Sequence, residues 1–197
     1  MPKQTFFNLS EDKRVRVFEA AIREFSAMPF AEASVNRIVK EAGISKGSFY
    51  QYFEDKNDVY HYMIEVIADR KAAVFNQVRD EHPDADVFEL ILRSTEVAMA
   101  ADKGELDYAE AGMRIDLDDS EIAAAVRQES SERFVRLVER DKERGLIKPD
   151  VDSRLLIDLI STFSISELYR NRNNRARYVE NLRAAINLIK EGVGTGR

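Results

Sequence analysis

"SVNRIVKEAGISKGSFYQYFEDK", residues 34–56, is the stretch that decides the fold of this chain. Its first half has apolar residues at helical spacing, which predicts a short helix with Ser34 as its N-cap. Gly43 follows the last of these apolar residues, and a glycine in the left-handed conformation is a common helix end. Ser45 then caps a second helix. Two helices joined by so tight a glycine turn are typical of a helix-turn-helix motif.

The second helix of this pair has a small, polar outward face. When Phe49 points inward on a helical wheel, Gly47 and Gln51 fall almost opposite to it. Tyr52 and Phe53 lie on the inward side with Phe49, and Ser48 and Tyr50 lie on the flanks. Such a face, with Lys46 in the first turn, can approach a DNA major groove, where Gln pairs with adenine and Lys or Ser reaches bases or phosphates. The alternative is a helical hairpin whose Tyr and Lys side chains are only solvated surface.

Composition limits what this motif can belong to. The chain has 197 residues, 44% of them hydrophobic and 34% charged, which is enough to bury a core without help. It has no cysteine, which excludes disulfides, thiolate catalysis and Cys-ligated zinc. The longest apolar runs, such as "LLIDLI" at 155–160, fall far short of the roughly 18 residues of a spanning helix. We expect a cytoplasmic protein without a membrane partner.

The rest of the chain also has the pattern of helices. Only eight Gly and four Pro interrupt it, and between them apolar residues recur at helical rather than strand spacing. Before the motif, one helix is expected from the cap at Ser10 to just before Pro29. After it, helices are expected at about 56–79, 85–101, 105–113, 120–144, 153–170 and 175–191. We therefore predict an all-α fold with a helix-turn-helix domain at 1–56 and a larger helical domain at 57–197.

Charge is divided unevenly between these two parts. Residues 1–56 hold nine basic and eight acidic residues, so the remaining 141 residues hold 21 basic and 28 acidic ones. The N-terminal part is thus only mildly basic, although nucleic-acid-binding domains are usually more so. The positions of its charges therefore matter more than their sum.

The motif resembles the TetR family of bacterial transcriptional regulators. The matching residues are Ser34, Ile38, "AGIS" at 42–45, "KGSFYQYF" at 46–53 and Lys56. The total length and the helix before the motif fit the same family. One departure is Val39, where such motifs more often have Ala, and its added bulk lies where the two motif helices meet.

This resemblance implies roles for single residues. Ser34 would bind a phosphate with its hydroxyl and amide, Tyr50 would bind a phosphate and Gln51 would read a base. Lys46 and Gly47 would approach bases or backbone, and Lys56 would hold the backbone. The candidate DNA-binding residues are Ser34, Arg37, Lys46, Gly47, Ser48, Tyr50, Gln51, Tyr52 and Lys56.

The larger domain is expected to form a homodimer. The last two helices, 153–170 and 175–191, are apolar over so wide an arc that each must be covered on more than one side. Given the resemblance, two such helices from each subunit would form a four-helix bundle. The candidate interface residues are Leu156, Ile160, Val179, Leu182, Ile186 and Ile189, with Leu155, Leu159 and Tyr169 beside them. Burial within one subunit is the alternative.

A small-molecule pocket is also expected in the larger domain. Its candidate lining residues are Phe75, Phe88, Met99, Tyr108, Met113, Phe134 and Phe163. They would suit an apolar or amphipathic effector, and Met would make the pocket adaptable. Ordinary core packing is the alternative for each of them. The helix at 56–79 runs from the motif into this domain and is the expected lever between effector and DNA.

Signals for enzymes and cofactors are weak. The two histidines, His61 and His82, are 21 residues apart. "DLDDSE" at 116–121 lacks the glycine and the acidic residue that a calcium loop needs at its sixth and twelfth positions, so it reads as a helix cap. The sequence contains no Gly-rich phosphate loop and no nucleophile elbow. We expect no catalytic activity, no metal and no cofactor.

Two functions remain at this point. The first is a ligand-responsive repressor that binds a palindromic operator in double-stranded DNA as a homodimer. The second is a helical small-molecule carrier or protein-interaction module that does not bind DNA. The outward residues of the segment at 46–56 favour the first.

Overall fold

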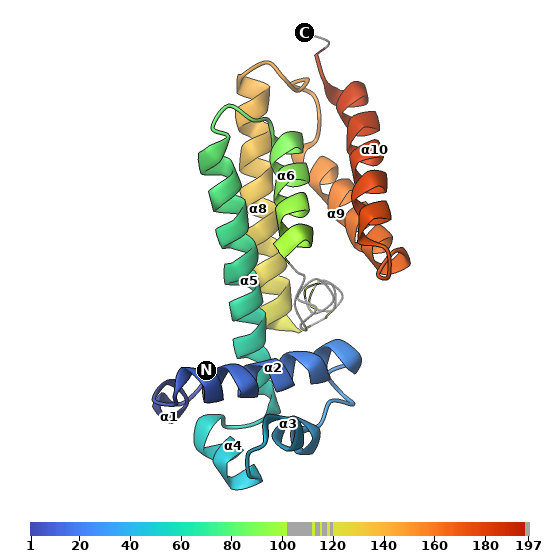
Figure 1. Cartoon of the computed structure of the whole chain (residues 1–197). Helices are drawn as coiled ribbons and strands as arrows, with labels where there is room; N and C mark the ends of the chain where they lie inside the picture. The colour runs from blue at the N-terminus through green and yellow to red at the C-terminus, as the bar shows by residue number, and fades with distance from the viewer. Residues whose placement is uncertain (102–111, 113–114, 116–117, 119, 196–197) are drawn as a thin grey trace. The chain divides into compact units, whose positions relative to one another are not determined.

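The structure is a computed structural model that describes residues 1–101, 112, 115, 118 and 120–195 (Figure 1). In this part of the chain all regular elements are helices, and the only β pairing is an isolated bridge between Ile147 and Gly194. The predicted all-α class is confirmed. Apart from residue 112, the predicted helix at 105–113 lies outside the described residues. Among the described helices, none is long and apolar enough to cross a membrane.

The chain divides into two compact units. The first contains Met1–Arg70 and the described residues of 102–115, and the second contains Lys71–Ala101 and the described residues of 116–197. The first unit therefore extends past the boundary at residue 56 that we predicted, because it includes the first part of the long helix that follows the motif. That helix, α5 (Lys56–Glu81), contributes residues to both units.

The first unit contains the predicted helix-turn-helix. Before α5 it contains α1 (Gln4–Phe7), α2 (Glu11–Ala27), α3 (Val35–Ala42) and α4 (Lys46–Tyr52). Helices α3 and α4 form the motif. Helix α2 begins after Ser10, as predicted, and ends before Pro29. Its first turn carries two acidic residues, which favour a helix N-terminus. The short helix α1 was not predicted.

Aromatic side chains form much of the core of the first unit. Phe6, Phe49 and Phe53 are fully buried. The ring of Phe53 lies 4.9 Å from that of Phe6 and 5.3 Å from that of Phe49, centroid to centroid. Tilted rings at such distances attract each other beyond their loss of exposed area. The core therefore links α1 to the second helix of the motif.

The second unit is a bundle made from the end of α5 and four further described helices. These are α6 (Val87–Ala101), α8 (Glu121–Glu143), α9 (Ser153–Arg170) and α10 (Arg175–Val193). Helix α6 packs on α8 and α10, and α9 packs on the same two helices (Figure 1). Side chains of Ser120, Asp152 and Asn174 cap the last three helices by accepting backbone N–H bonds. These local caps explain why the predicted bounds agree within a few residues.

A buried carboxylate fastens the start of α6 to the end of α8. The side chain of Asp141 has no exposed surface and accepts a hydrogen bond of 2.6 Å from the amide of Val87. Arg140 and Arg144 neutralise it at 2.9 and 3.0 Å. The same two arginines donate to the carbonyl of Ala85. A buried charge with partners on every side is tolerated in a core, and here it holds two helices together.

Candidate nucleic-acid interface

The turn between α3 and α4 has the geometry that the sequence predicts. Gly43 adopts a left-handed conformation with φ of 66°, which a residue with a side chain rarely adopts. Here the amide of Ile44 reaches back to the carbonyl of Val39 at 3.0 Å. At the next helix, Ser45 Oγ accepts a hydrogen bond of 3.0 Å from the amide of Ser48. The turn is thus fixed by one glycine and one serine cap.

Hydrogen bonds to the carboxylate of Glu24 fix the start of α3. The amide of Ser34 donates to Glu24 Oε1 at 2.7 Å. Arg37 donates to the same carboxylate from Nε at 2.9 Å and from Nη2 at 2.6 Å. Burial alone would raise the pKa of Glu24, but the hydrogen bonds from Arg37 and Ser34 outweigh it and lower the pKa below its ordinary value. A carboxylate of α2 therefore holds the first turn of α3.

These contacts change the roles expected for two candidate residues. The Ser34 amide, predicted to bind a phosphate, is already bonded to Glu24. Its hydroxyl does not cap α3. Arg37 is exposed over about half of its side chain, but its guanidinium is bonded to Glu24 and to the carbonyl of Glu32. Both residues thus position α3 in this structure, and phosphate binding by the Ser34 hydroxyl stays a prediction.

The exposed face of α4 carries most of the predicted base and phosphate contacts. Lys46, Gly47, Tyr50 and Gln51 are all exposed, while Phe49 between them is fully buried. The side chains of Lys46 and Gln51 form no hydrogen bond or ion pair with the described residues. They are therefore available to an external partner on a helix that is itself held firmly.

Ser48 and Gly47 differ in what the fold requires of them. The hydroxyl of Ser48 lies 2.9 Å from Ser45 Oγ and so takes part in the cap. A Cβ added to Gly47 would meet Ser45 Oγ at 3.7 Å, which is an ordinary van der Waals contact. Glycine within a helix costs about 0.5–1 kcal/mol relative to alanine. Packing among the described residues therefore leaves room for a side chain at this position.

Tyr52 does not lie on this exposed face, and its selection as a DNA contact is corrected. Only 6% of it is exposed. Its ring lies 6.3 Å from that of Phe6, and the ammonium of Lys13 lies 5.8 Å from its centroid. The physical reason is its position on the helix, which is on the same side as the buried Phe49. Tyr52 is therefore a core residue of the first unit.

Lys56 is also engaged within the fold. Its ammonium donates to the carbonyls of Phe30 at 2.6 Å and Ala33 at 3.0 Å, and it lies 4.4 Å from the centroid of the Phe30 ring. These contacts tie the loop between α2 and α3 to the first turn of α5. The sequence did not reveal them, because they join residues more than 20 positions apart. Backbone binding by Lys56 stays a prediction.

Two positioning elements were missed from the sequence. Glu24 falls on the apolar stripe of α2, seven residues after the buried Val17, and a carboxylate at such a position signals a partner. The second element is the segment before α2, where Lys3 and Thr5 bond to carbonyls of α4. The adjacent pair Phe6 and Phe7 was the available signal for a segment that packs against the core.

In the second unit the described candidate pocket residues, apart from Met99, pack in or against the hydrophobic core. Phe75 and Phe88 are buried in the core. Phe134 packs on Phe75 with ring centroids 5.2 Å apart, and Phe163 is half-buried against the same core. For these residues the alternative of core packing is correct, because they fill the space between the helices. Tyr108 and Met113 lie outside the described residues.

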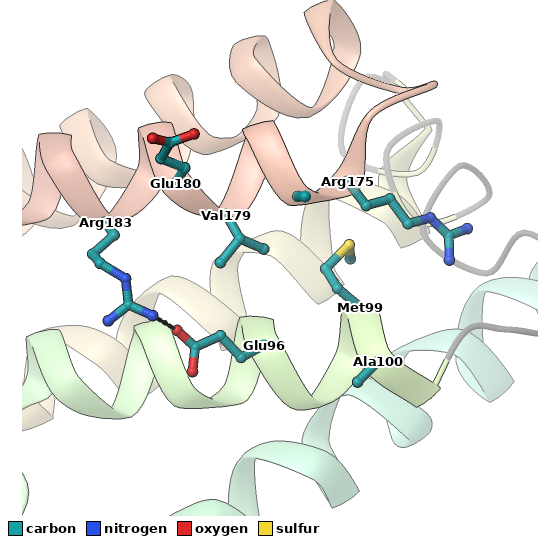
Figure 2. A pocket seen from close by; sticks show the side chains of 8 residues that line it. Glu96, Met99, Ala100, Arg175, Val179, Glu180 and Arg183 are labelled. Atoms are coloured by element: carbon teal, nitrogen blue, oxygen red, sulfur yellow. Dashed lines mark hydrogen bonds and ion pairs between the residues drawn. The ribbon is translucent and has the colours of Figure 1, made fainter.

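Met99 is different because it borders a groove between α6 and α10. The groove has a volume of about 500 Å³. Figure 2 shows Met99 of α6 and Val179 of α10 pointing into the space between the two helices. An ion pair between Glu96 and Arg183 joins the helices at one end (Figure 2). The described residues that line this α6–α10 groove are Glu96, Met99, Ala100, Arg175, Ala176, Val179, Glu180 and Arg183.

The predicted interface residues also lie mainly inside the subunit. The buried ones, each with at most 4% exposure, are Leu156, Ile160, Leu182 and Ile186. Val179 and Ile189 are half-buried against the same core. Burial within one chain, the alternative, therefore applies to the four buried residues, which pack with residues of α6 and α8, and an interface role of Val179 and Ile189 stays a prediction.

Other apolar residues of these two helices are exposed instead. We call Leu155, Leu159, Tyr169 and Leu188 the exposed apolar residues of α9 and α10, and between 55% and 71% of each is exposed. Leu155 and Leu159 are one turn apart on α9, and Tyr169 follows Leu155 by about four turns. These three therefore lie along one side of α9.

Comparison with known proteins agrees with this geometry. Residues 17–63 match the family model described as bacterial regulatory proteins, tetR family. An HTH-type transcriptional regulator of Staphylococcus aureus (strain USA300) is 33% identical over 84 residues, which cover 42% of this chain and 45% of that protein. The match thus spans less than half the length of this curated relative. Other strains have relatives with the same identity.

Solved structures extend the similarity to nearly the whole chain. A TetR family transcriptional regulator from Chloroflexus aurantiacus J-10-FL is 28% identical, with a TM-score of 0.74 and coverage of 98% of this chain and 99% of that one. A gamma-butyrolactone receptor, ArpA-like, shares the fold at 19% identity, with a TM-score of 0.63 and coverage of 89% and 97%. The predicted resemblance to the TetR family is confirmed. The helix-turn-helix of this chain lies within the matched residues 17–63.

Proposed function

We propose that this protein is a sequence-specific DNA-binding transcriptional regulator, and that it acts as a ligand-responsive repressor. The observation that carries the proposal is the exposed face of α4. On that face the side chains of Lys46 and Gln51 form no hydrogen bond or ion pair with the described residues, and Gly47 has no side chain although a Cβ there would make an ordinary contact. A helix with this face enters a major groove closely, and its side chains reach the base edges.

The proposed division of work on DNA follows from which side chains are free. Gln51 reads a base, because its amide can both donate to and accept from adenine. Lys46 and Tyr50 bind phosphates or neighbouring bases from the same exposed face. Glu24, Arg37 and Lys56 hold α3 and the loop before it in position and contribute through geometry.

The repressor is proposed to act as a homodimer through the exposed apolar residues of α9 and α10. Large apolar side chains exposed along a helix mark a surface for association. A second copy offers the same apolar side chains, so a twofold axis makes the surface self-complementary. Two copies of α4 would then read a palindrome with half-sites about 34 to 36 Å apart, or farther by whole turns.

The α6–α10 groove is the proposed site for a small apolar or amphipathic effector. Its volume of about 500 Å³ lies within the usual range for small-molecule pockets. Apolar side chains line its walls, and charged groups of both signs stand around it. The gamma-butyrolactone receptor, which shares the fold, is by its name a receptor for gamma-butyrolactone. Helix α5 carries residues of both units, so a change at one end can reach the other.

Selection from random double-stranded DNA tests the central claim. The purified protein should enrich a palindromic sequence, and a gel-shift titration should show that it binds this sequence far more tightly than random DNA. If no sequence is enriched over several rounds, the protein is not a sequence-specific regulator. The function as a helical carrier or protein-interaction module would then be favoured.

A further inference from the structure

The last turn of α4 ends in carbonyl groups that the helix itself cannot bond. A helix leaves its last four C=O groups without intrahelical partners. In α4 the first of these, on Phe49, accepts from the amide of Phe53 at 2.9 Å. The other three belong to Tyr50, Gln51 and Tyr52, and residues from the start of the chain bond all of them.

These three bonds come from two residues. Lys3 donates from Nζ to the carbonyl of Tyr50 at 3.0 Å and from its backbone amide to the carbonyl of Tyr52 at 2.7 Å. Thr5 donates its hydroxyl to the carbonyl of Gln51. The capping groups of a seven-residue helix thus lie more than 40 positions away in the sequence.

Phe6 anchors the segment that supplies these bonds. Its side chain is fully buried, and its ring lies 4.9 Å from that of Phe53 and 5.3 Å from that of Tyr62. Phe53 directly follows α4, and Tyr62 belongs to α5. The donors of Lys3 and Thr5 are therefore held in place by the packing of Phe6.

We propose that Lys3, Thr5 and Phe6, which we call the α4 brace, set the orientation of Tyr50 and Gln51 and thereby the sequence specificity of DNA binding. This inference rests on the proposed function. Lys3 and Thr5 are positioning residues, because their bonds end on the backbone of the two residues whose exposed side chains face the partner.

The physical reason is that a short helix frays at its ends. Helices of fewer than about 12 residues are marginal in water, so α4 depends on tertiary contacts. Without the brace, its last turn would open and move Gln51 relative to a base edge. Base reading needs both bonds of a bidentate pair in register, whereas phosphate contacts tolerate movement. Loss of the brace should therefore reduce specificity more than general affinity for DNA.

The test uses variants that keep side-chain volume. Thr5→Val removes the hydroxyl donor with little change of shape, and Lys3→Met removes the ammonium while keeping most of the stem. Thr5→Ser keeps a donor and is the conservative variant. Gln4→Ala is the matched control, because the Gln4 side chain bonds to Asn8 within its own segment, at 3.2 Å.

The first measurement is amide hydrogen exchange in the free, full-length protein. We expect the double variant with Lys3→Met and Thr5→Val to speed exchange at Gln51, Tyr52 and Phe53 about threefold to tenfold, the range that one or two lost hydrogen bonds produce. Amides of Ile38 and Val39 in α3 should be unchanged. Unchanged exchange in α4, or an equal increase in both helices, would overturn the proposal.

The second measurement is the ratio of affinities for the selected operator and for random DNA at one salt concentration. The double variant should lose about tenfold in operator affinity and less than twofold on random DNA, while Thr5→Ser and Gln4→Ala keep the ratio. Equal losses on both DNAs would show that the brace only stabilises the fold. If the unaltered protein selects no sequence, the proposed function fails, and the exchange measurement still decides whether the brace holds α4.

Discussion

Arg37 of α3 and Glu24 of α2 are joined by three hydrogen bonds. Both oxygens of the Glu24 carboxylate accept from Arg37 Nε at 2.9 Å, and one of them also accepts from Nη2 at 2.6 Å. The Ser34 amide donates to the same carboxylate. One side chain of α2 therefore fixes both the N-cap and the first turn of α3.

Glu24→Gln should destabilise the first unit. The amide side chain keeps an acceptor for Ser34 but loses the charge that holds Arg37, and it places an NH₂ group where an acceptor is needed. We expect the free energy of unfolding to fall by at least about 1 kcal/mol, as for loss of a charge-assisted hydrogen bond at a buried carboxylate. Urea denaturation followed by circular dichroism measures it. Glu41→Gln is the control, since its exposed pair with Arg23 joins the same two helices and should matter little.

The contribution of Glu24 should depend on pH with a definite sign. Because its pKa is lowered in the folded state, its stabilisation is present above the ordinary value of about 4.5 and is lost as the pH falls through the folded pKa. The difference in unfolding free energy between the unaltered protein and Glu24→Gln should therefore be constant from pH 7 to pH 5 and shrink below that. A difference that stays constant down to pH 3 would contradict the lowered pKa.

Substitutions on α9 should separate folding from assembly. Leu155→Glu combined with Leu159→Glu places charges on the exposed side of α9, so we expect monomers in light scattering that keep the helical circular dichroism of the unaltered protein. Ile160→Glu places a charge in the core and should cost more than about 4 kcal/mol, which prevents folding. Intact dimers of the double leucine variant would show that the interface lies elsewhere.

Two lysines should differ in how they affect binding to DNA. Lys46→Ala should weaken binding to all DNA sequences by the same factor. It should also reduce the slope of log K against log salt by about 1. Lys56→Met should leave this slope unchanged but lower the free energy of unfolding by about 1 to 2 kcal/mol, because its ammonium bonds to loop carbonyls. Gel-shift titrations at several salt concentrations decide this. A reduced slope for Lys56→Met would make it a phosphate contact after all.

Gln51→Ala should relax base preference at one base pair per half-site and cost about 1 to 3 kcal/mol on the selected operator. Repeating the selection with the variant gives the new preference directly. Gln128→Ala serves as a control, because Gln128 lies on α8 and bonds to Glu132. An unchanged preference would mean that Gln51 does not read a base.

A bulky side chain in the α6–α10 groove should prevent effector binding and leave binding to the operator unchanged. Ala176→Phe adds a ring where the groove is lined by a methyl group. Thermal-shift titration with medium-chain fatty acids and acyl lactones should show binding to the unaltered protein and none to the variant, while both bind the operator equally. Retained binding by the variant would place the ligand elsewhere.

The motif could be predicted because its signals are local. Gly43 and Ser45 determine the turn through their own backbone and side-chain chemistry, and the structure agrees with both. The exposed set of Lys46, Gly47, Tyr50 and Gln51 follows from helical geometry once Phe49 is placed inward. Tyr52 was selected as a DNA contact although the same helical geometry already placed it on the inward side.

The remaining features depend on contacts between distant residues. Helix α1 has four residues, too few for any periodicity, and its bonds to α4 follow only from the packing of Phe6. The ammonium of Lys56 is directed by a loop that precedes it by more than 20 positions. Helix α9 is apolar on both Leu155 and Leu156, so the sequence alone does not decide which of these sides faces the core.

At Gly47 the stability of α4 and its proposed binding to DNA make opposite demands. An alanine there would fit the free protein without a clash and would favour the helix by about 0.5–1 kcal/mol. If the proposed function holds, the same methyl group would stand between α4 and the floor of the DNA major groove. Selection for thermostability alone would thus replace this glycine, and a more stable protein obtained in that way would be a poorer regulator.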